Sequence, residues 1–570
     1  MEANDGSVVF ADDAARALLA GCVASLSRPD AEQWEMVKSN PSRTVWRGSI
    51  SGQRLYIKHF HGTSITHRLS RALGRRRAVQ EMRFAMLLSQ ASVETAPVLA
   101  VGFGEAREWI VTAAVEPAVA GDAWHRQMLC GDAAGQRRIR QATGQLAEMV
   151  ARMHSAGLVH RDLHCGNLLV LEGPQPRLVL MDLHRTAVCR RLTRHQRAAN
   201  IAQLMHDRLD CTTRAERLRF LKRYLAASGC GGGIRVWQGL IGRLAQRHRQ
   251  RQFARNDKRT MRSNRYFLPI ALSGGWRGQV MLESRKPAFA TPATQARFTL
   301  DDWKNSLGDV ERLFAGGATV VKDSQSGLVV RRKLNVGACE LDVFIKRPRR
   351  KKPYKTIIDC FRPARALKAF ALGHSLLNRQ IPTALPLAFL QRRVGPFLVD
   401  SILITETVPG MRLDEFLSSL LARVARPTKV TAAQHRQLAQ QVLGQMGKML
   451  QRLHDNNFAH RDLKETNMIV RWEAQRDPQV VLLDLDGLKK CRRITTRRRF
   501  QGLMRLNVSL LRCPPVNHAG RLRMLLGYLR RPGSGRINFK PYWRILEQWS
   551  ARKLKQQINS QRKRQKAIRR

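Results

Sequence analysis

The sequence predicts an α+β protein made of two similar domains, each with a small antiparallel β-sheet followed by a mainly helical lobe. Three observations lead to this prediction. One octapeptide pattern occurs twice, about 300 residues apart. Segments of β-like alternation precede each copy, and helical patterns flank it. The chain of 570 residues is also too long for one ordinary core, which agrees with two or three domains.

The repeated pattern is the strongest functional indication in the chain. It reads His-Arg-Asp-Leu-x-x-x-Asn at residues 160–167 and again at 460–467. An apolar run that ends in aspartate follows each copy, at Asp182 and Asp484. A histidine, Arg-Asp and an asparagine five residues after the aspartate are typical of protein-kinase-like catalytic loops. The pattern therefore predicts two tandem protein-kinase-like domains.

The chemistry of phosphoryl transfer explains why these residue types recur at this spacing. One carboxylate receives the proton of the acceptor hydroxyl, while a carboxamide and a second carboxylate hold the magnesium ion on the phosphates of ATP. The apolar runs are interpreted as short buried strands that end at the metal-binding aspartates. The catalytic candidates are Asp162 and Asp462, and the metal-binding candidates are Asn167, Asp182, Asn467 and Asp484.

The first kinase-like domain is predicted over residues 34–270, after an N-terminal helical extension over residues 1–33. The extension carries apolar residues at helical spacing. Short apolar segments separated by turn residues then predict an antiparallel sheet. The expected strands lie at residues 35–38, 44–47, 55–58, 95–99 and 109–112, and a long helix is expected over residues 133–156.

Two residues of this predicted sheet lobe are candidates for ATP binding. Lys58 ends the third strand, where a kinase places the lysine that contacts the α- and β-phosphates. Glu81 lies in a helix expected from Arg75 onward and is the best candidate to pair with Lys58; the alternative is an exposed carboxylate. The turn at residues 39–43 stands where a phosphate-binding loop is expected, but it has no Gly-x-Gly-x-x-Gly pattern.

The second kinase-like domain is predicted over residues 301–550, after a linker at residues 271–300 that is rich in Pro, Ala and Thr. The same order of strands restarts there, and Lys346 ends the strand that corresponds to the strand of Lys58. Identities also recur in the helix before each catalytic loop, which indicates duplication of a whole domain. A basic tail without acidic residues follows at residues 551–570.

The two predicted ATP sites differ at two positions. Alignment of the halves places Ala369 where Glu81 stands, which leaves Lys346 without a carboxylate partner on the helix. In the hinge, Glu406 stands where the first half has Ala113, and Glu406 is therefore a candidate contact to the nucleotide. We expect both sites to be active, and the first more securely than the second.

The charge of the chain predicts a polyanionic partner. Lys and Arg number 101 against 43 Asp and Glu, which gives a net charge of +58. Nucleic acid, an anionic membrane surface and a phosphorylated substrate are all compatible with this excess. A generically basic, solvated surface is the fourth alternative, and charge alone does not choose among them.

Cysteine usage and hydropathy indicate a cytoplasmic protein. The ten cysteines show no CxxC pairs, so neither a zinc site nor a disulfide framework is predicted. Acidic residues near the start argue against a secretory signal, and no uncharged apolar run has the length of a membrane span. A peripheral position on a membrane remains compatible with this pattern.

The segments after the two metal-binding aspartates argue against a peptide substrate. Protein kinases have an activation segment there that ends in Ala-Pro-Glu and docks the peptide. Asp182 and Asp484 are instead followed within a few residues by arginine-rich helical sequence.

At these residues the chain resembles the bacterial lipopolysaccharide kinase family, the Kdo and core-heptose kinases. The resemblance rests on the catalytic-loop motif and on residues 68–77, 181–185, 321–323, 347–352 and 381–388. It implies ATP- and Mg²⁺-dependent phosphorylation of a sugar hydroxyl, of Kdo or heptose, on a lipid-linked glycan at the cytoplasmic face of the inner membrane. Arginines suit the phosphates and carboxylates of such an acceptor.

Two alternative functions remain open at this point. The first is a protein kinase or small-molecule kinase, for which acidic acceptor-binding residues would be expected. The second is a tandem pseudokinase that acts as a scaffold for polyanions, including nucleic acid, through its basic tail. The intact sets of Lys, Asp, Asn and Asp in both halves argue against the second alternative.

Overall fold

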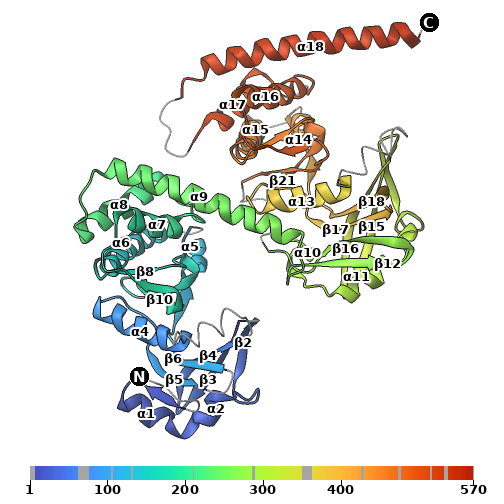
Figure 1. The fold of residues 1–570 in the computed structure, drawn as a ribbon. Coiled ribbons are helices and arrows are strands. Elements are labelled where there is room, and N and C mark those ends of the chain that lie inside the picture. The colour runs from blue at the N-terminus through green and yellow to red at the C-terminus, as the bar shows by residue number, and fades with distance from the viewer. Residues whose placement is uncertain are drawn as a thin grey trace. The chain divides into compact units, whose positions relative to one another are not determined.

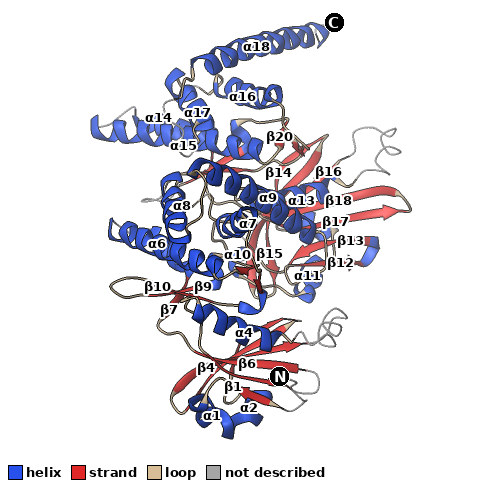
Figure 2. Ribbon diagram, turned by 60° about the vertical axis from the view of Figure 1, so that its left-hand side comes forward, coloured by secondary structure: helices blue, strands red, loops and turns tan. Residues whose placement is uncertain are grey.

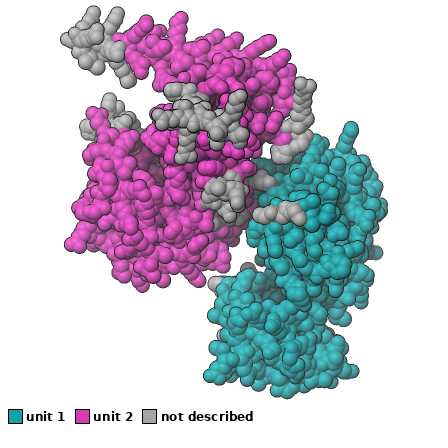
Figure 3. Space-filling model, turned by 180° about the vertical axis from the view of Figure 1, so that it is seen from behind, with its two compact units in different colours: residues 1–250 teal, residues 251–570 magenta. Residues whose placement is uncertain are grey.

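The computed structural model describes residues 7–568 except 41, 62–75, 104–106, 130–132, 210, 286–288, 350–362, 425–428, 473–476, 514–515 and 532–536. The basic stretches at residues 68–77 and 347–352 thus fall largely outside the described residues. The chain forms two compact units, Met1–Gln250 and Arg251–Arg570 (Figure 3). In each unit the strands gather in one lobe and helices dominate the other (Figure 2). This arrangement confirms the predicted α+β fold class.

The first lobe of unit 1 is a six-stranded antiparallel sheet with the strand order β1-β5-β6-β4-β3-β2 (Figure 1). Its elements are β1 (Val8–Phe10), α1 (Asp13–Leu19), α2 (Val23–Ser27), β2 (Glu35–Asn40), β3 (Arg43–Ile50), β4 (Gln53–His61), α4 (Arg77–Gln90), β5 (Val98–Phe103) and β6 (Arg107–Ala113). Alternation along β6 sends Trp109 and Val111 to the core beneath α1 and α2, and Ile110 to the α4 face. Lys58 pairs directly with Ile110 and therefore shares the α4 face.

The N-terminal segment corrects the prediction of a wholly helical extension. Val8–Phe10 form the edge strand β1, with Val9 opposite Val101 of β5. The predicted apolar stripe does pack against the sheet, where Leu19 and Leu26 are fully buried. A three-residue strand is too short to show the alternation by which strands are recognised in a sequence.

The second lobe of unit 1 is mainly helical and holds the first catalytic loop between two small sheets. Its helices are α5 (Gly121–Leu129), α6 (Ala133–Ser155), α7 (Arg194–Met205), α8 (Arg214–Ser228) and α9 (Ile234–Thr260), and its strands are β7 (Ala118–Ala120), β8 (Leu158–His160), β9 (Leu168–Leu171), β10 (Arg177–Leu180) and β11 (Thr186–Val188). Strand β8 leads into the loop, and β10 leads to Asp182 as predicted. Tyr224 and Trp237 are at the centre of the core behind the loop.

The first lobe of unit 2 is a seven-stranded antiparallel sheet with the strand order β12-β13-β17-β18-β16-β15-β14. Its elements are β12 (Phe267–Leu272), β13 (Trp276–Met281), α10 (Pro292–Gln295), α11 (Leu300–Leu307), β14 (Thr319–Ser324), β15 (Gly327–Val336), β16 (Cys339–Pro348), α13 (Arg365–Leu377), β17 (Pro386–Val394) and β18 (Phe397–Glu406). Lys346 pairs with Val329 and Leu403, as Lys58 pairs with Val45 and Ile110. The two lysines thus occupy equivalent positions in the two sheets.

Part of the segment predicted as a linker belongs to this second sheet. Strand β13 pairs with both β12 and β17, so the β12–β13 hairpin extends the sheet by two strands. Its turn contains Gly274 and Gly275, both with positive φ. The sequence did not distinguish this hairpin from a linker because tight turns and linkers share a glycine- and serine-rich composition.

The second lobe of unit 2 repeats the helical arrangement around the second catalytic loop. Its elements are β19 (Met411–Arg412), α14 (Leu413–Val424), α15 (Lys429–Asp455), β20 (Phe458–His460), β21 (Met468–Arg471), β22 (Gln479–Leu482), β23 (Leu488–Lys490), α16 (Thr496–Leu510), α17 (His518–Leu529) and α18 (Lys540–Ile568). The predicted basic tail forms the C-terminal half of α18. Within the part of the chain that the structure describes, no helix combines the length and the apolar character needed to cross a membrane.

Candidate active site

The lysine and the glutamate predicted for the first ATP site form an ion pair. Lys58 of β4 and Glu81 of α4 are both buried, and Lys58 Nζ lies 2.5 Å from Glu81 Oε1. The same Nζ lies 3.9 Å from Oδ1 of Asp182. Strand β4, helix α4 and the loop of Asp182 therefore converge at Lys58, and the alternative of an exposed Glu81 is excluded.

Basic side chains surround the Asp182 carboxylate. Arg43 binds its carboxylate with both terminal nitrogens, and His184 Nδ1 lies 3.4 Å from Oδ1. Burial alone would raise the pKa of Asp182, but the contacts with His184 and Arg43 and the charge of Lys58 hold this pKa well below its usual range. The Asp182 backbone has a left-handed φ of 63°, a sparsely populated conformation that is typical of functional sites.

The histidine of the catalytic-loop motif connects the backbones of the two aspartates of the site. His160 Nδ1 accepts a hydrogen bond from the Asp162 backbone N–H at 3.3 Å, so Nε2 carries the proton and donates to the Asp182 carbonyl at 3.2 Å. Asn167 Nδ2 donates to the Asp162 carbonyl at 2.9 Å. These bonds fix the loop from within and leave the Asp162 carboxylate partly exposed, 3.6 Å from Arg185 Nη1.

A second buried histidine supports the loop from behind. His154 of α6 is fully buried between Tyr224 and Asn200, and Asn200 donates to the His160 carbonyl at 2.7 Å. In the second half, His454 contacts the Tyr528 hydroxyl in the same way. These contacts indicate that both histidines support the loop structurally.

Asp162 and Asp182 open onto a large cavity in unit 1. The cavity has a volume of about 1000 Å³ and also carries Arg43, Arg77 and Arg185 on its wall. Arg161 lines it as well. Burial and the nearby charges of Arg185 and Arg43 lower the pKa of Arg77. The cavity thus combines two acidic groups with an excess of guanidinium groups, which suits a phosphate-bearing ligand.

The second site holds its lysine with a different carboxylate. Lys346 Nζ lies 2.7 Å from Asp486 Oδ2 and 3.2 Å from Asp484 Oδ1. Burial would lower the pKa of Lys346, but Asp486 and Asp484 raise it above its usual value. Ala369 is buried at the position aligned with Glu81. The carboxylate that the helix lacks is thus supplied by Asp486, two residues after the predicted metal ligand.

The second catalytic loop has the same internal bonds as the first. His460 accepts from the Asp462 backbone N–H at 3.1 Å and donates to the Asp484 carbonyl at 2.7 Å, and Asn467 Nδ2 donates to the Asp462 carbonyl at 3.1 Å. One contact is new, because Lys464 Nζ lies 2.9 Å from Asp462 Oδ1.

Glu406 does not present a free carboxylate to the predicted nucleotide site. It is buried at the end of β18, where Oε2 accepts a hydrogen bond from the Thr291 hydroxyl at 2.6 Å and Oε1 accepts from the Ala293 N–H at 3.0 Å. Burial raises the pKa of Glu406. Both oxygens are thus bonded to residues at the N-terminus of α10, and Glu406 is not part of the proposed nucleotide site.

Four residues near the predicted sites were not found from the sequence. His184 and Asp486 each follow a predicted metal-binding aspartate by two residues, and Lys464 follows a predicted catalytic aspartate by two, so a comparison of the two motifs could have found them. Arg43 reaches Asp182 from a hairpin 139 residues away, and no local pattern indicates such a contact.

A strand lysine, a catalytic loop and a strand-end aspartate in each of two lobed units define a phosphotransferase of the protein-kinase-like class. The model of the lipopolysaccharide kinase (Kdo/WaaP) family matches residues 30–224 and 351–528. These regions make up more than half of the chain, so the chain belongs to the lipopolysaccharide kinase (Kdo/WaaP) family and is a kinase.

Two solved structures are among those similar to the chain. WaaP in complex with acyl carrier protein is 22% identical, with a TM-score of 0.33, and the match covers 42% of this chain and 98% of that one. The BubR1 kinase domain is 10% identical, with a TM-score of 0.27, and the match covers 42% of this chain and 95% of that one. Comparison with curated proteins gives no significant match.

Proposed function

We propose that the protein transfers the γ-phosphate of ATP to a hydroxyl of Kdo or heptose in the lipopolysaccharide core or a related lipid-linked glycan. One observation carries this proposal: Asp182, which lies beside the buried Lys58–Glu81 pair, shares with Asp162 a cavity that is lined by arginines. Family membership supports the acceptor class.

In the proposed reaction, Lys58 contacts the α- and β-phosphates while Glu81 holds its side chain in place. The Asp162 carboxylate, partly exposed on the cavity wall, receives the proton of the sugar hydroxyl. A magnesium ion, for which the ionised Asp182 and the Asn167 amide offer the oxygen ligands that it prefers, would neutralise the phosphate charge. His160 keeps Asp162 and Asp182 in register through its two hydrogen bonds.

The arginines of the cavity favour an anionic acceptor. Arg77, Arg161 and Arg185 line the same cavity as the proposed catalytic carboxylate of Asp162. A guanidinium group binds carboxylate or phosphate oxygens in bidentate fashion, so these side chains can orient an acidic sugar with its hydroxyl toward Asp162. The net charge of +58 further supports a peripheral position on the anionic inner face of the inner membrane.

The second half is proposed to act as a second active site. Lys346, Asp462, Asn467 and Asp484 take the roles of Lys58, Asp162, Asn167 and Asp182, respectively, and the internal bonds of the loop are the same. Asp486 takes the role of the helix glutamate.

The proposal is tested by transfer of labelled phosphate from ATP to extracted core glycolipid. The wild type should label the glycolipid, and the double variant Asp162→Ala/Asp462→Ala should not. The double variant Asp301→Ala/Asp309→Ala, at two exposed carboxylates of unit 2, controls for lost negative charge. Labelling of protein alone, or glycolipid labelling that survives the catalytic double variant, would overturn the proposal.

A further inference from the structure

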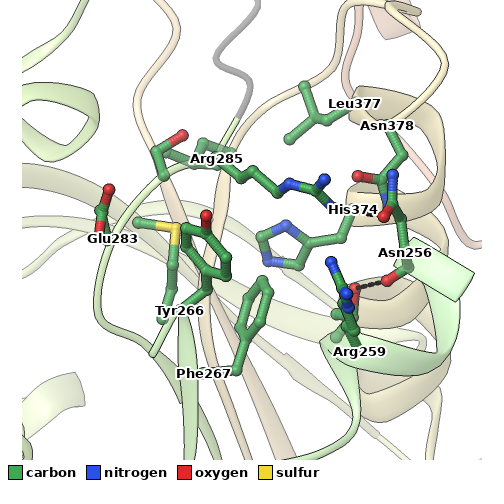
Figure 4. Close-up of a pocket in the computed structure, with 13 residues that line it drawn as sticks. Asn256, Arg259, Tyr266, Phe267, Glu283, Arg285, His374, Leu377 and Asn378 are labelled. Atoms are coloured by element: carbon green, nitrogen blue, oxygen red, sulfur yellow. Dashed lines mark hydrogen bonds between the residues drawn. The ribbon is translucent and has the colours of Figure 1, made fainter. Parts of the chain in front are cut away.

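Unit 2 contains a small polar pocket that the proposed reaction does not use. The pocket lies between the end of α9, the β12–β13 hairpin and α13 (Figure 4). The space open to the centres of water-sized atoms is about 20 Å³. One water needs about 10–15 Å³ on this measure, so the pocket is larger than the site of a single water. Its polar lining includes Asn256, Arg259, Tyr266, Glu283, Arg285 and His374.

His374 presents an unpartnered nitrogen to this pocket. The side chain is buried against Phe267 and Phe370, and Nε2 has no hydrogen-bond partner among the described residues. The ring is hydrogen-bonded to the backbone of Pro386. Because proline has no N–H group, His374 must donate this bond from Nδ1. Burial lowers the pKa of His374 to about 3, so the neutral ring offers the Nε2 lone pair as an acceptor.

The charge beside this acceptor is positive and uncompensated. Arg285 reaches across the pocket toward His374 (Figure 4) and donates to Asn256 Oδ1. Burial, followed by the nearby charges of Arg259 and Arg265, lowers the pKa of Arg285. In the part of the chain that the structure describes, no carboxylate forms an ion pair with any of these three arginines.

The one carboxylate of the pocket lining does not occupy this position. Glu283 lies at the opposite edge, beyond Tyr266 as seen from His374 (Figure 4). A half-buried guanidinium without a counter-ion loses hydration, and the hydrogen bond from Arg285 to Asn256 replaces only part of it. An anion bound between Arg285 and His374 would compensate for the lost hydration of the guanidinium group.

We propose that the pocket binds a small oxyanion that carries a proton of its own, with inorganic phosphate as the simplest example. The charged oxygens of such an ion accept hydrogen bonds from Arg285 and from Arg259 at the rim. Its O–H group donates to Nε2 of His374. Sulfate has a similar size and shape but carries no proton at neutral pH, so it would face the Nε2 lone pair with an oxygen.

The experiment is isothermal titration of the full-length protein at pH 7 with phosphate and, separately, with sulfate at matched ionic strength. We expect saturable phosphate binding that is at least ~10-fold tighter than sulfate binding, because an acceptor left unpaired in a buried site is penalised. Arg285→Gln should weaken this phosphate binding by about 10-fold or more, since a charged hydrogen bond is lost.

Two further variants separate this pocket from other phosphate sites on a basic protein. Arg277→Gln removes an exposed charge from β13 of the same sheet and should leave the phosphate affinity unchanged. His374→Phe keeps an aromatic ring in the cluster with Phe267 and Phe370, and should remove the preference for phosphate over sulfate. Equal affinities for phosphate and sulfate in the wild type, or phosphate binding that Arg285→Gln and Arg277→Gln affect alike, would overturn the proposal.

Discussion

The two halves hold the same lysine with carboxylates from different elements. In the first half, Lys58 is paired with Glu81 of α4, and His184 stands two residues after Asp182. In the second half, Asp486 stands at the position of His184 and pairs with Lys346, while the helix position is Ala369. The requirement that is common to both halves is a carboxylate at the lysine, not a particular helix residue.

Backbone contacts fix this alignment independently of the side chains. Thr95 forms a parallel bridge with Leu180, and Thr383 forms the same bridge with Leu482. The turn after each helix also has equivalent bonds, Val93 N–H to the Leu88 carbonyl and Ile381 N–H to the Leu376 carbonyl. The same spacing places Ala369 at the position of Glu81. The exchange of carboxylates is therefore a difference in sequence and not in register.

The exchange changes what each helix can control. Movement of α4 in the first half would break the Lys58–Glu81 bond and thereby displace the lysine. In the second half, Asp484 and Asp486 belong to one loop and both contact Lys346, so the lysine follows that loop and not α13. We infer that the position of the helix affects only the first site.

The largest expected effect concerns whether both halves are active. Asp162→Ala and Asp462→Ala should each lower the transfer by their own half by about 10²–10⁴-fold, because each removes the group that receives the proton. Mass spectrometry of the glycolipid product measures the phosphates that each single variant still adds. An Asp462→Ala protein that is indistinguishable from wild type would reduce the comparison to one active half and one silent half.

The lysine partners should give the next largest effect. Glu81→Gln should lower first-half transfer by about 10–100-fold, because the buried Lys58 then keeps only the more distant Asp182 carboxylate, 3.9 Å away. Asp486→Asn should lower second-half transfer less, by about 3–10-fold, because Asp484 still contacts the more exposed Lys346. Initial rates in backgrounds with the other half inactivated measure both effects. Equal losses would contradict the asymmetry.

Because of Arg43, we expect the two halves to need different magnesium concentrations for half-maximal activity. Its guanidinium occupies the Asp182 carboxylate, whereas the register of β3 and β15 places Gly327 at the equivalent position in the second half. Arg43→Gln should therefore lower the half-saturating magnesium concentration of the first half by roughly 3–10-fold, because a competing charged hydrogen bond is removed. Magnesium titrations of the initial rate show this shift, and a raised requirement would contradict it.

Buried histidines should make both units less stable in mild acid. Burial lowers the pKa of His154 to about 4 and that of His454 and His374 to about 3. The unfolded chain takes up these protons near pH 6.5. The contribution of the neutral histidines to the free energy of unfolding is therefore fully present above pH 6.5, and it is lost as the pH falls toward the pKa values of the folded state. Each such histidine should cost about 2 kcal/mol at pH 5. Denaturant unfolding measures this effect: between pH 7.5 and pH 5, the free energy of unfolding should fall less in His374→Phe than in the wild type.

Much of the catalytic geometry could be predicted because it is local or repeated. The two loops, their asparagines and the strand-end aspartates follow from spacing within about 25 residues. The Lys58–Glu81 pair followed from the order of strands and helix. Comparison of the halves also found that Ala369 leaves Lys346 without a helical partner, although the sequence alone did not identify Asp486 as the substitute.

Contacts between distant segments could not be predicted. The Arg43–Asp182 pair depends on how the β2–β3 hairpin lies over the metal-binding loop, and hairpin geometry is not encoded near either residue. The hinge position of Glu406 predicts a contact to the nucleotide, but the structure shows its carboxylate bonded at the N-terminus of α10. This four-residue helix lies in a segment whose composition predicts a linker. The β12–β13 hairpin was missed for the same reason.

The central claim, that a carboxylate at the lysine is required and that its origin is exchangeable, is tested most directly by rescue. The measurement is the rate of phosphate transfer to core glycolipid by Asp162→Ala/Asp486→Asn, with and without the additional change Ala369→Glu. The account predicts that Ala369→Glu restores most of the rate lost through Asp486→Asn, while it changes little when Asp486 is present. A rate that stays low after Ala369→Glu in a folded protein would contradict the account.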